Sequence, residues 1–279
     1  MLQLEKEWAQ ILTPHVGNSG RNTLITYQTT TDRSRTGYFM KSFSVTDIGL
    51  KRSVNQDSVY CSENKIGPLS NLFIVADGMG GHKAGDMASK LCVETVCERV
   101  GRSEYTTPVS ILNDAVAEAH NRVKGCSESN PDYEGMGTTL VAATIMDGSL
   151  YVANVGDSRL YLLRDSLCQI TEDHSLVEEM VKSGELAKEN VRSHPNKNII
   201  TRALGIGSAV EPDFFELKLR ENDIVLMCSD GLTNMIEDAE IECIIKREQE
   251  NLEKAGMTLL NRANDMGGKD NITVLLVRV

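Results

Sequence analysis

The chain has 279 residues, of which 41% are hydrophobic and 25% are charged, and its formal net charge at pH 7 is −11. This length allows one large domain or two small ones with a sizeable core, and the composition is that of a folded globular protein. The acidic balance argues against a protein that binds nucleic acid through a basic face and against docking on an anionic membrane surface.

The sequence carries no signal for a membrane or for secretion. No apolar run approaches the ~18 residues that cross a bilayer, and charged residues interrupt the first positions, where a secretory signal needs an apolar stretch. The seven cysteines are scattered and contain no C-x-x-C pair, which favours neither a disulfide framework nor a zinc site. We therefore expect a cytoplasmic protein.

Residues 1–41 differ from the rest of the chain. They are polar and rich in Ser and Thr, with no sustained apolar periodicity. We predict a loosely ordered extension over 1–41 and a single domain over 42–279. A second interpretation is that translation begins at Met40, because the first clear strand pattern starts just after it.

From Phe43 onward, strand and helix patterns mix without the regular alternation of a parallel α/β fold. Strands are predicted at Phe43–Ile48, Leu72–Ala76, Thr139–Met146, Leu150–Val155, Leu160–Leu163, Ile224–Cys228 and Ile272–Val277. Helices are predicted at Gly85–Val100, Pro108–Lys124, Ser175–Ser183, Asp238–Gln249 and Leu252–Asp265. The segment Thr139–Arg164 is typical of a meander, with a tight turn at Asp147-Gly148. This order favours antiparallel sheets with helices packed outside, an α+β fold.

The most informative feature is the position of four aspartates at the ends of apolar runs. Asp77 and Asp230 follow such runs, Asp270 precedes one, and Asp57 opens another. Continuous apolar runs are buried on both faces, so their ends lie at the margin of the core. Taken singly, each aspartate is also explained as a turn residue or a helix cap.

If these carboxylates converge, their repulsion must be compensated. Two carboxylates ~4 Å apart repel by roughly 4 kcal/mol at an effective dielectric constant near 20. Oxygen-only ligands favour Mg²⁺ or Mn²⁺ over zinc. The glycine after Asp77 lets the backbone approach an ion closely, so the carbonyl group of Gly78 is a further candidate ligand.

Seven short motifs follow one another in a definite order. They are RSVNQD at 52–57, DGMGGH at 77–82, GTT at 137–139, NVGDSR at 154–159, TEDHS at 171–175, SDGLT at 229–233 and DNIT at 270–273. Each motif alone is weak, but the ordered set is specific. Over residues 42–279 the chain resembles the metal-dependent protein phosphatases (PPM, the type 2C serine/threonine phosphatases), above all their compact bacterial members.

The resemblance implies a fold and a reaction. The fold is a pair of packed antiparallel β-sheets flanked by helices, an α-β-β-α sandwich. The reaction is hydrolysis of phosphoserine and phosphothreonine on proteins, by water held between two Mn²⁺ or Mg²⁺ ions, with room for a weaker third ion. The implied partners are phosphorylated proteins and a bacterial serine/threonine kinase whose action the enzyme opposes.

The resemblance also assigns metal ligands. Asp77 would bridge two ions, and the carbonyl group of Gly78 would bind one of them. Asp230 and Asp270 would complete the other site, while Asp57 would act mainly through water bound to the ions. These assignments agree with the aspartates singled out from the apolar runs.

Two further residues receive roles, and two positions depart from some relatives. Asp157 matches the position that helps to hold the third ion, and Arg52 matches the residue that grips the substrate phosphate. The alternative interpretation of Arg52 is a surface arginine paired with Asp57 or Glu63. Gln56 stands where some relatives carry Glu, and Asn234 where some carry an acid; both differences bear on the affinity for the third ion.

The leaving oxygen needs a proton, and two histidines are candidates because imidazole titrates near neutral pH. We assign His82 as the candidate general acid, although it also fits a cap for the following helix, and water bound to the ions could act instead. His174 fits a turn residue at the start of a helix better than a catalytic group.

Other chemistries lack their motifs. No cysteine is followed six residues later by arginine, and the phosphate loop, the dinucleotide fingerprint and the G-x-S-x-G elbow are all missing from the sequence. The alternatives to an enzyme of this family are a catalytically silent regulator that binds phosphoproteins and, less favoured by the acidic charge, a metal-dependent nuclease. The polar segment Gly184–Ile199 predicts a mobile surface loop and is our candidate for a flap that gates substrate access.

Overall fold

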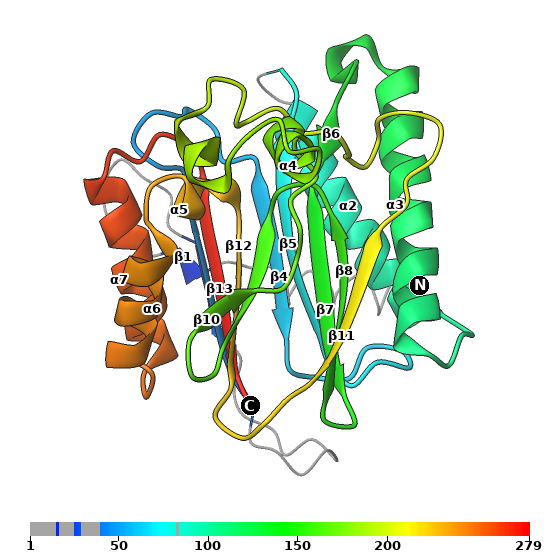
Figure 1. The fold of residues 1–279 in the computed structure, drawn as a ribbon. Helices are drawn as coiled ribbons and strands as arrows, with labels where there is room; N and C mark the ends of the chain where they lie inside the picture. Colours follow the sequence, from blue (N-terminus) through cyan, green and yellow to red (C-terminus); the bar gives the residue numbers. More distant parts are fainter. Residues whose placement is uncertain (1–14, 17–24, 29–39, 82–83) are drawn as a thin grey trace.

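Two antiparallel sheets form the centre of the protein (Figure 1). The computed structural model describes residues 15–16, 25–28, 40–81 and 84–279. The first sheet has the order β1-β2-β3-β13-β12-β9-β10, with bounds His15–Val16, Ile25–Gln28, Lys41–Asp47, Ile272–Arg278, Ile224–Cys228, Arg159–Leu163 and Leu167–Gln169. The second has the order β11-β8-β7-β5-β4, with bounds Asp213–Lys218, Ser149–Val155, Leu140–Met146, Leu72–Met79 and Asp57–Ser62, and the short β6 (Gly137–Thr138) pairs with β5.

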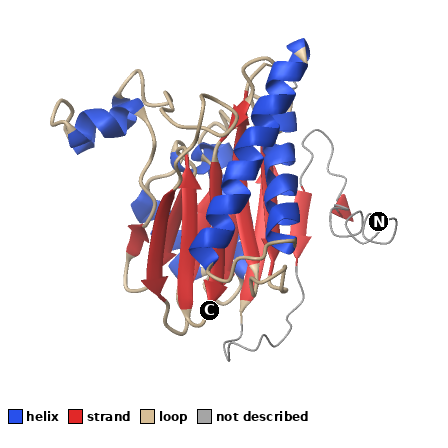
Figure 2. Ribbon diagram, turned by 90° about the vertical axis from the view of Figure 1, so that its right-hand side faces the viewer, coloured by secondary structure: helices blue, strands red, loops and turns tan. Residues whose placement is uncertain are grey.

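Helices cover the outer face of each sheet. Those against the second sheet are α2 (Ala84–Gly101) and α3 (Pro108–Ser129), the two long helices in front of the strands in Figure 2. Those against the first sheet are α5 (Asp230–Thr233), α6 (Asp238–Arg247) and α7 (Leu252–Asp265). The short α4 (Leu176–Lys182) lies in the connection between the sheets. None of the described helices is long and apolar enough to cross a bilayer.

The alternation of side chains along the strands builds three apolar layers. In β5, Ile74 and Ala76 pack with α2 and α3, whereas Phe73 and Val75 pack with the other sheet. The same alternation places Leu276 of β13 against the helices of its own side. Both faces of the central strands are therefore buried, which explains their continuous apolar runs. The α-β-β-α sandwich implied by the family resemblance is confirmed.

Most predicted elements are found, with differences at the edges. The turn at Asp147-Gly148 joins β7 to β8, and both residues have positive φ values of 52° and 72°. The predicted elements did not include β4, β6, β10, β11 and the four-residue α5; β11 is a half-exposed edge strand without an apolar run. The prediction also ended the strand before Asp77, whereas β5 continues through Met79 because β4 and β6 pair with its last residues.

The predicted N-terminal extension lies mostly outside the described residues. Its described parts are β1, β2 and residues 40–41, and β2 pairs with β3 in the register Ile25↔Thr46. The predicted loop at 184–199 contains a 3-10 helix at Lys188–Ser193 with no buried residue. The rest of that loop carries turns and runs over the surface.

Candidate metal centre

Five aspartates come to one end of the two sheets because the strands that carry them begin or end there. Asp57 opens β4 and is the register partner of Asp77 in β5. Asp230 opens α5 directly after β12, and Asp270 lies two residues before β13, the neighbour of β12. Asp157 lies in the loop through which the chain passes from β8 in one sheet to β9 in the other. Strand pairing thus gathers acids that are up to 213 positions apart (57 to 270).

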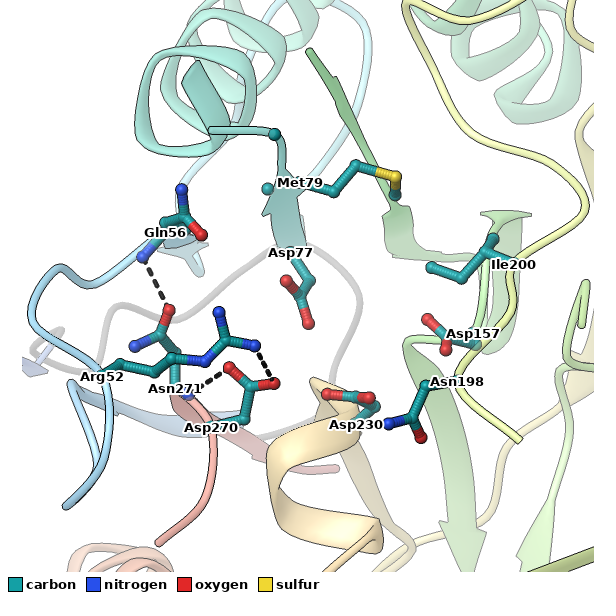
Figure 3. Close-up of a pocket in the computed structure, with 12 residues that line it drawn as sticks. Arg52, Gln56, Asp77, Met79, Asp157, Asn198, Ile200, Asp230, Asp270 and Asn271 are labelled. Atoms are coloured by element: carbon teal, nitrogen blue, oxygen red, sulfur yellow. Dashed lines mark hydrogen bonds and ion pairs between the residues drawn. The ribbon is translucent and has the colours of Figure 1, made fainter. Parts of the chain in front are cut away.

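Four of these aspartates and Arg52 line one pocket of about 220 Å³. In Figure 3 the carboxylates of Asp77, Asp157, Asp230 and Asp270 point toward the same space. The other lining residues are Gln56, Gly78, Met79, Gly80, Asn198, Ile200 and Asn271. Three of the four aspartates singled out from the apolar runs, Asp77, Asp230 and Asp270, therefore meet at one pocket, while their role as metal ligands stays a prediction.

Backbone contacts hold Asp77 and Gly78 in place. The Asp77 amide donates to the hydroxyl group of Thr139 at 2.9 Å, and the Thr139 amide donates to the carbonyl group of Asp77 at 2.9 Å. A Cβ on Gly78 would lie 1.9 Å from the carbonyl oxygen of Gly85. The glycine is therefore required by the close approach of the following helix, a packing reason that the sequence did not reveal.

Asp57 does not line the pocket but lies beside Asp77 in the neighbouring strand, with only 6% of its surface exposed. Its Oδ2 accepts hydrogen bonds from the hydroxyl groups of Ser229 at 2.7 Å and Thr273 at 2.6 Å. Its Oδ1 is buried and has no hydrogen-bond partner among the described residues. Oδ2 of Asp57 thus links the two sheets. Oδ1 is a buried acceptor that could bind a water molecule or a cation.

Arg52 extends into the pocket from the loop between β3 and β4. Its side chain is 47% exposed, and its Nη2 lies 2.7 Å from Asp270 Oδ2, so its partner is neither of the nearby acids expected for a plain surface arginine. Asn271 holds this loop: its side-chain amide donates to the carbonyl groups of Ile48 and Val54 and accepts from the Gln56 amide. Asn271 was not among the predicted site residues, although it stands inside the DNIT motif.

Burial and mutual repulsion raise the pKa values of the clustered aspartates. Burial, and after it the charges of the other four aspartates, raises the pKa of Asp77 well above its usual value. Burial raises the pKa of Asp57 to about 7 and that of Asp230 to about 6, and the charge of Asp270 adds to both rises. Burial and then the charge of Asp230 raise the pKa of Asp157 well above its usual value. The cluster therefore favours bound protons or bound cations.

The oxygens present suit hard divalent cations. The unpartnered Oδ1 atoms of Asp57 and Asp230 are buried beside the pocket, and all candidate ligands are oxygen donors. Within the described residues, no three His, Cys, Asp or Glu side chains converge on a single ion-sized point. That spacing is compatible with Mg²⁺-like sites, in which one or two carboxylates bind the ion and water fills the remaining positions.

The predicted flap contacts the centre through Lys197. The Lys197 ammonium group donates to Asn234 Oδ1 at 3.2 Å, and Asn234 Nδ2 donates to Asp230 Oδ2 at 2.8 Å. Asn198 and Ile200 continue this segment along the pocket wall (Figure 3). Asn234 was predicted only as a departure from some relatives, and the structure shows it as the link between the flap and Asp230.

The two candidate histidines have different outcomes. His82 lies outside the described residues, so its predicted role stays a prediction. His174 is 5% exposed, and both of its ring nitrogens have partners: Nδ1 accepts from the Gly156 amide, and Nε2 lies 3.1 Å from Asp213 Oδ2. This arrangement favours the structural reading of His174 over a role as general acid.

Comparison with known proteins identifies the family. The sequence profile of the family "Protein phosphatase 2C" matches residues 51–271. The serine/threonine phosphatase stp of Listeria innocua is 45% identical over 239 residues, which cover 83% of this chain and 93% of that protein. The chain therefore belongs to the protein phosphatase 2C family, as the ordered motifs predicted.

Solved structures give the same result. A serine/threonine phosphatase of S. agalactiae is 39% identical with a TM-score of 0.80, and the match covers 86% of this chain and 99% of that one. The catalytic domain of the phosphatase PstP, solved in complex with two manganese ions, is 34% identical with a TM-score of 0.76, covering 86% and 97% of the two chains. The likeness thus extends over nearly the whole length of both structures.

Proposed function

We propose that this protein hydrolyses phosphoserine and phosphothreonine on other proteins, with water activated by two Mn²⁺ or Mg²⁺ ions in the pocket between the sheets. The observation that carries the proposal is the meeting of four aspartates and Arg52 around one pocket of about 220 Å³, with a fifth aspartate, Asp57, buried beside Asp77. The phosphatase names of the relatives and the two manganese ions in the PstP structure support the same chemistry here.

The residues would divide the work by position. Asp77 would bridge the two ions, the Gly78 carbonyl group would bind one, and Asp230 with Asp270 would hold the other. The divalent ions lower the pKa of water toward neutrality and offset the negative charge of the substrate phosphate. Asp57, buried beside Asp77, would act through water with its unpartnered oxygen.

Arg52 would bind the phosphate. Its planar guanidinium group offers parallel donors that match two phosphate oxygens. The group is half exposed and lies at the rim of the pocket, next to Asp270, so a substrate can reach it from solvent. Asp157, on the opposite side in Figure 3, would help to hold a weaker third ion.

A direct test compares the purified chain with and without metal. With Mn²⁺ it should hydrolyse a small aryl phosphate and a phosphothreonine peptide, and excess EDTA should remove both activities. Asp230→Asn should abolish turnover while the thermal unfolding transition remains. Inactivity with Mn²⁺, Mg²⁺ and Co²⁺, combined with tight binding of the phosphopeptide, would instead support the catalytically silent regulator.

His82 remains our candidate general acid. A general acid matters most when the leaving group is a poor one, so His82→Gln should slow a phosphothreonine peptide more than an aryl phosphate. With the peptide substrate, the fall in rate at high pH that deprotonation of a general acid causes should disappear in this variant. Equal losses on both substrates, with an unchanged profile, would remove His82 from this role.

The flap and the cell context complete the proposal. Deleting Gly184–Ile199 should change the preference among phosphopeptides more than the activity on an aryl phosphate; equal losses would reject a gating role.

We also propose that residues 42–279 form the catalytic domain and that the protein acts in the cytoplasm against a bacterial serine/threonine kinase. A chain that starts at Met40 should keep full activity.

A further inference from the structure

His174 is a buried residue whose ring is fully engaged in hydrogen bonds. Its Nδ1 lies 3.1 Å from the amide nitrogen of Gly156, and its Nε2 lies 3.1 Å from Asp213 Oδ2. Because Nδ1 faces an N–H donor, it must act as the acceptor, and the proton of the neutral ring is on Nε2, which donates to Asp213. The orientation of the ring is therefore set from both sides.

The main chain of His174 contacts the same glycine. The His174 amide donates to the carbonyl group of Gly156 at 2.9 Å, so one residue satisfies both backbone polar groups of Gly156. Gly156 has a φ of +105°, and a Cβ there would lie 2.6 Å from the side chain of Thr139. Gly156 is thus held between His174 and Thr139, the residue that also binds the amide of Asp77. Asp157 follows directly in the chain.

The other side of His174 faces the end of the flap. Its carbonyl group accepts from the Thr201 amide at 2.8 Å. Its ring partner Asp213 also accepts from Arg202 Nη1 at 2.9 Å. A single buried residue therefore joins the loop that carries Asp157 to the point where the flap returns to the core.

We propose that His174 is a positioning residue for Asp157. The Nδ1 lone pair holds Gly156, and this contact places the Asp157 carboxylate at the pocket, where it takes part in holding the weaker third cation. The identity of that cation rests on the proposed function. The new claim concerns His174 and Gly156, which are not among the assigned metal ligands. His174 touches neither substrate nor cation; it acts through Gly156.

Two substitutions separate the contacts of the ring. In His174→Asn the side-chain oxygen takes the place of Nδ1, so the bond from Gly156 is kept and the bond to Asp213 is lost. In His174→Gln the amide nitrogen takes the place of Nε2, so the bond to Asp213 is kept and the acceptor for Gly156 is lost. The full chain is titrated with Mn²⁺, and electron paramagnetic resonance measures the free Mn²⁺ at each step. The titration gives the affinity of each bound ion.

We expect His174→Gln to weaken the third Mn²⁺ about tenfold, equivalent to ~1.4 kcal/mol, and to leave the two tighter ions unchanged. His174→Asn should stay within about threefold of the wild type. Amide hydrogen exchange without metal should show faster exchange at Gly156 in the Gln variant and near-normal exchange in the Asn variant. This second measurement depends on no cation and on no turnover.

His120 provides a matched control. It is also a buried histidine, 2% exposed, and its Nδ1 accepts from a glycine amide, that of Gly205, but among the described residues no hydrogen bond joins it to the Asp157 loop. His120→Gln should lower the unfolding temperature without changing the third Mn²⁺. If His174→Gln fails to fold, Asp213→Ala, which removes only the bond to Nε2, should stay within the same threefold limit, and a tenfold loss of the third Mn²⁺ in this variant would overturn the proposal.

Several results would overturn the proposal. They are equal affinity losses in the Asn and Gln variants, an unchanged third ion in the Gln variant, the same loss in His120→Gln, or binding of only two ions by the wild type. In each of these cases the two tighter ions and the turnover of the wild type would still be measured. Failure of the proposal on His174 can therefore be distinguished from failure of the proposed function.

Discussion

The acid-lined centre and the flap lie side by side but are held in different ways. The centre is supported by strand pairing and buried bonds, such as those from Ser229 and Thr273 to Asp57. The middle of the flap has an exposed 3-10 helix and is held by side chains: Arg192 contacts the Ile236 carbonyl group and Glu237, and Lys197 contacts Asn234. Backbone bonds hold the two ends of the flap. Exposed ion pairs contribute about 0–1 kcal/mol each. The geometry of the centre is thus built into the fold, whereas the middle of the flap depends on contacts that each contribute little.

The largest effect is expected at the bridging aspartate. Asp77→Asn removes one negative charge at the point where both ions would be held, so kcat/KM with Mn²⁺ should fall more than a hundredfold, beyond the ~10–100-fold typical of residues that support a ligand. The metal-free variant should be at least as stable as the wild type, because repulsion within the cluster is reduced. Turnover near the wild-type level would contradict the proposed ligand set.

A smaller but clear effect is expected at Asn271, which holds the Arg52 loop by three bonds. Asn271→Ala should lower kcat/KM roughly 10–100-fold, as for other residues that orient a functional group. The loss should appear largely in KM for phosphorylated substrates, because Arg52 would lose its position. An increase in the Mn²⁺ requirement with unchanged KM would show that Asn271 acts on the ions instead.

Without metal, the stability of the protein should fall as pH rises. The pKa values of Asp57 and Asp230 are raised from 3.8 to about 7 and about 6. A carboxyl group with a raised pKa in the folded state stabilises that state below its ordinary pKa and loses the contribution as pH rises through the raised value. Between pH 5 and 8 in EDTA we expect a loss on the order of 1–3 kcal/mol.

The measurement is thermal unfolding at several pH values in EDTA and in excess Mn²⁺. Cations replace the protons, so the fall with pH should disappear or reverse in Mn²⁺. Asp57→Asn should flatten the EDTA curve. A metal-free protein whose stability rises from pH 5 to 8 would contradict the raised pKa values.

The smallest effect is expected where the flap meets the centre. Lys197→Met breaks the contact with Asn234 and should change KM for a phosphopeptide a few-fold, in line with the ~0–1 kcal/mol of an exposed contact. Lys188→Met, at an exposed position of the same flap, removes the same charge away from Asn234 and serves as the control. Equal effects of the two variants would show a general charge effect rather than a specific link to Asp230.

The elements with long periodic or apolar patterns were predictable from the sequence. Helix Leu252–Asp265 and strand Ile224–Cys228 agree with the predicted bounds, because their own apolar residues decide both their type and their ends. The edge strand β11 was missed because its side chains are half exposed and carry no strong pattern. The end of β5 was misplaced because pairing with β4 and β6, rather than local sequence, continues that strand through Asp77.

By itself, the sequence determined the fold class, the family and the identity of the acids, since these depend on residue types and their order. The tertiary structure decided which residues support the acids: Asn271, Asn234, and the clamp of Gly156 by His174. These contacts join positions brought together only by the pairing of strands that are far apart in the chain. Register between distant strands is set by packing of the whole sandwich, and no local pattern encodes it.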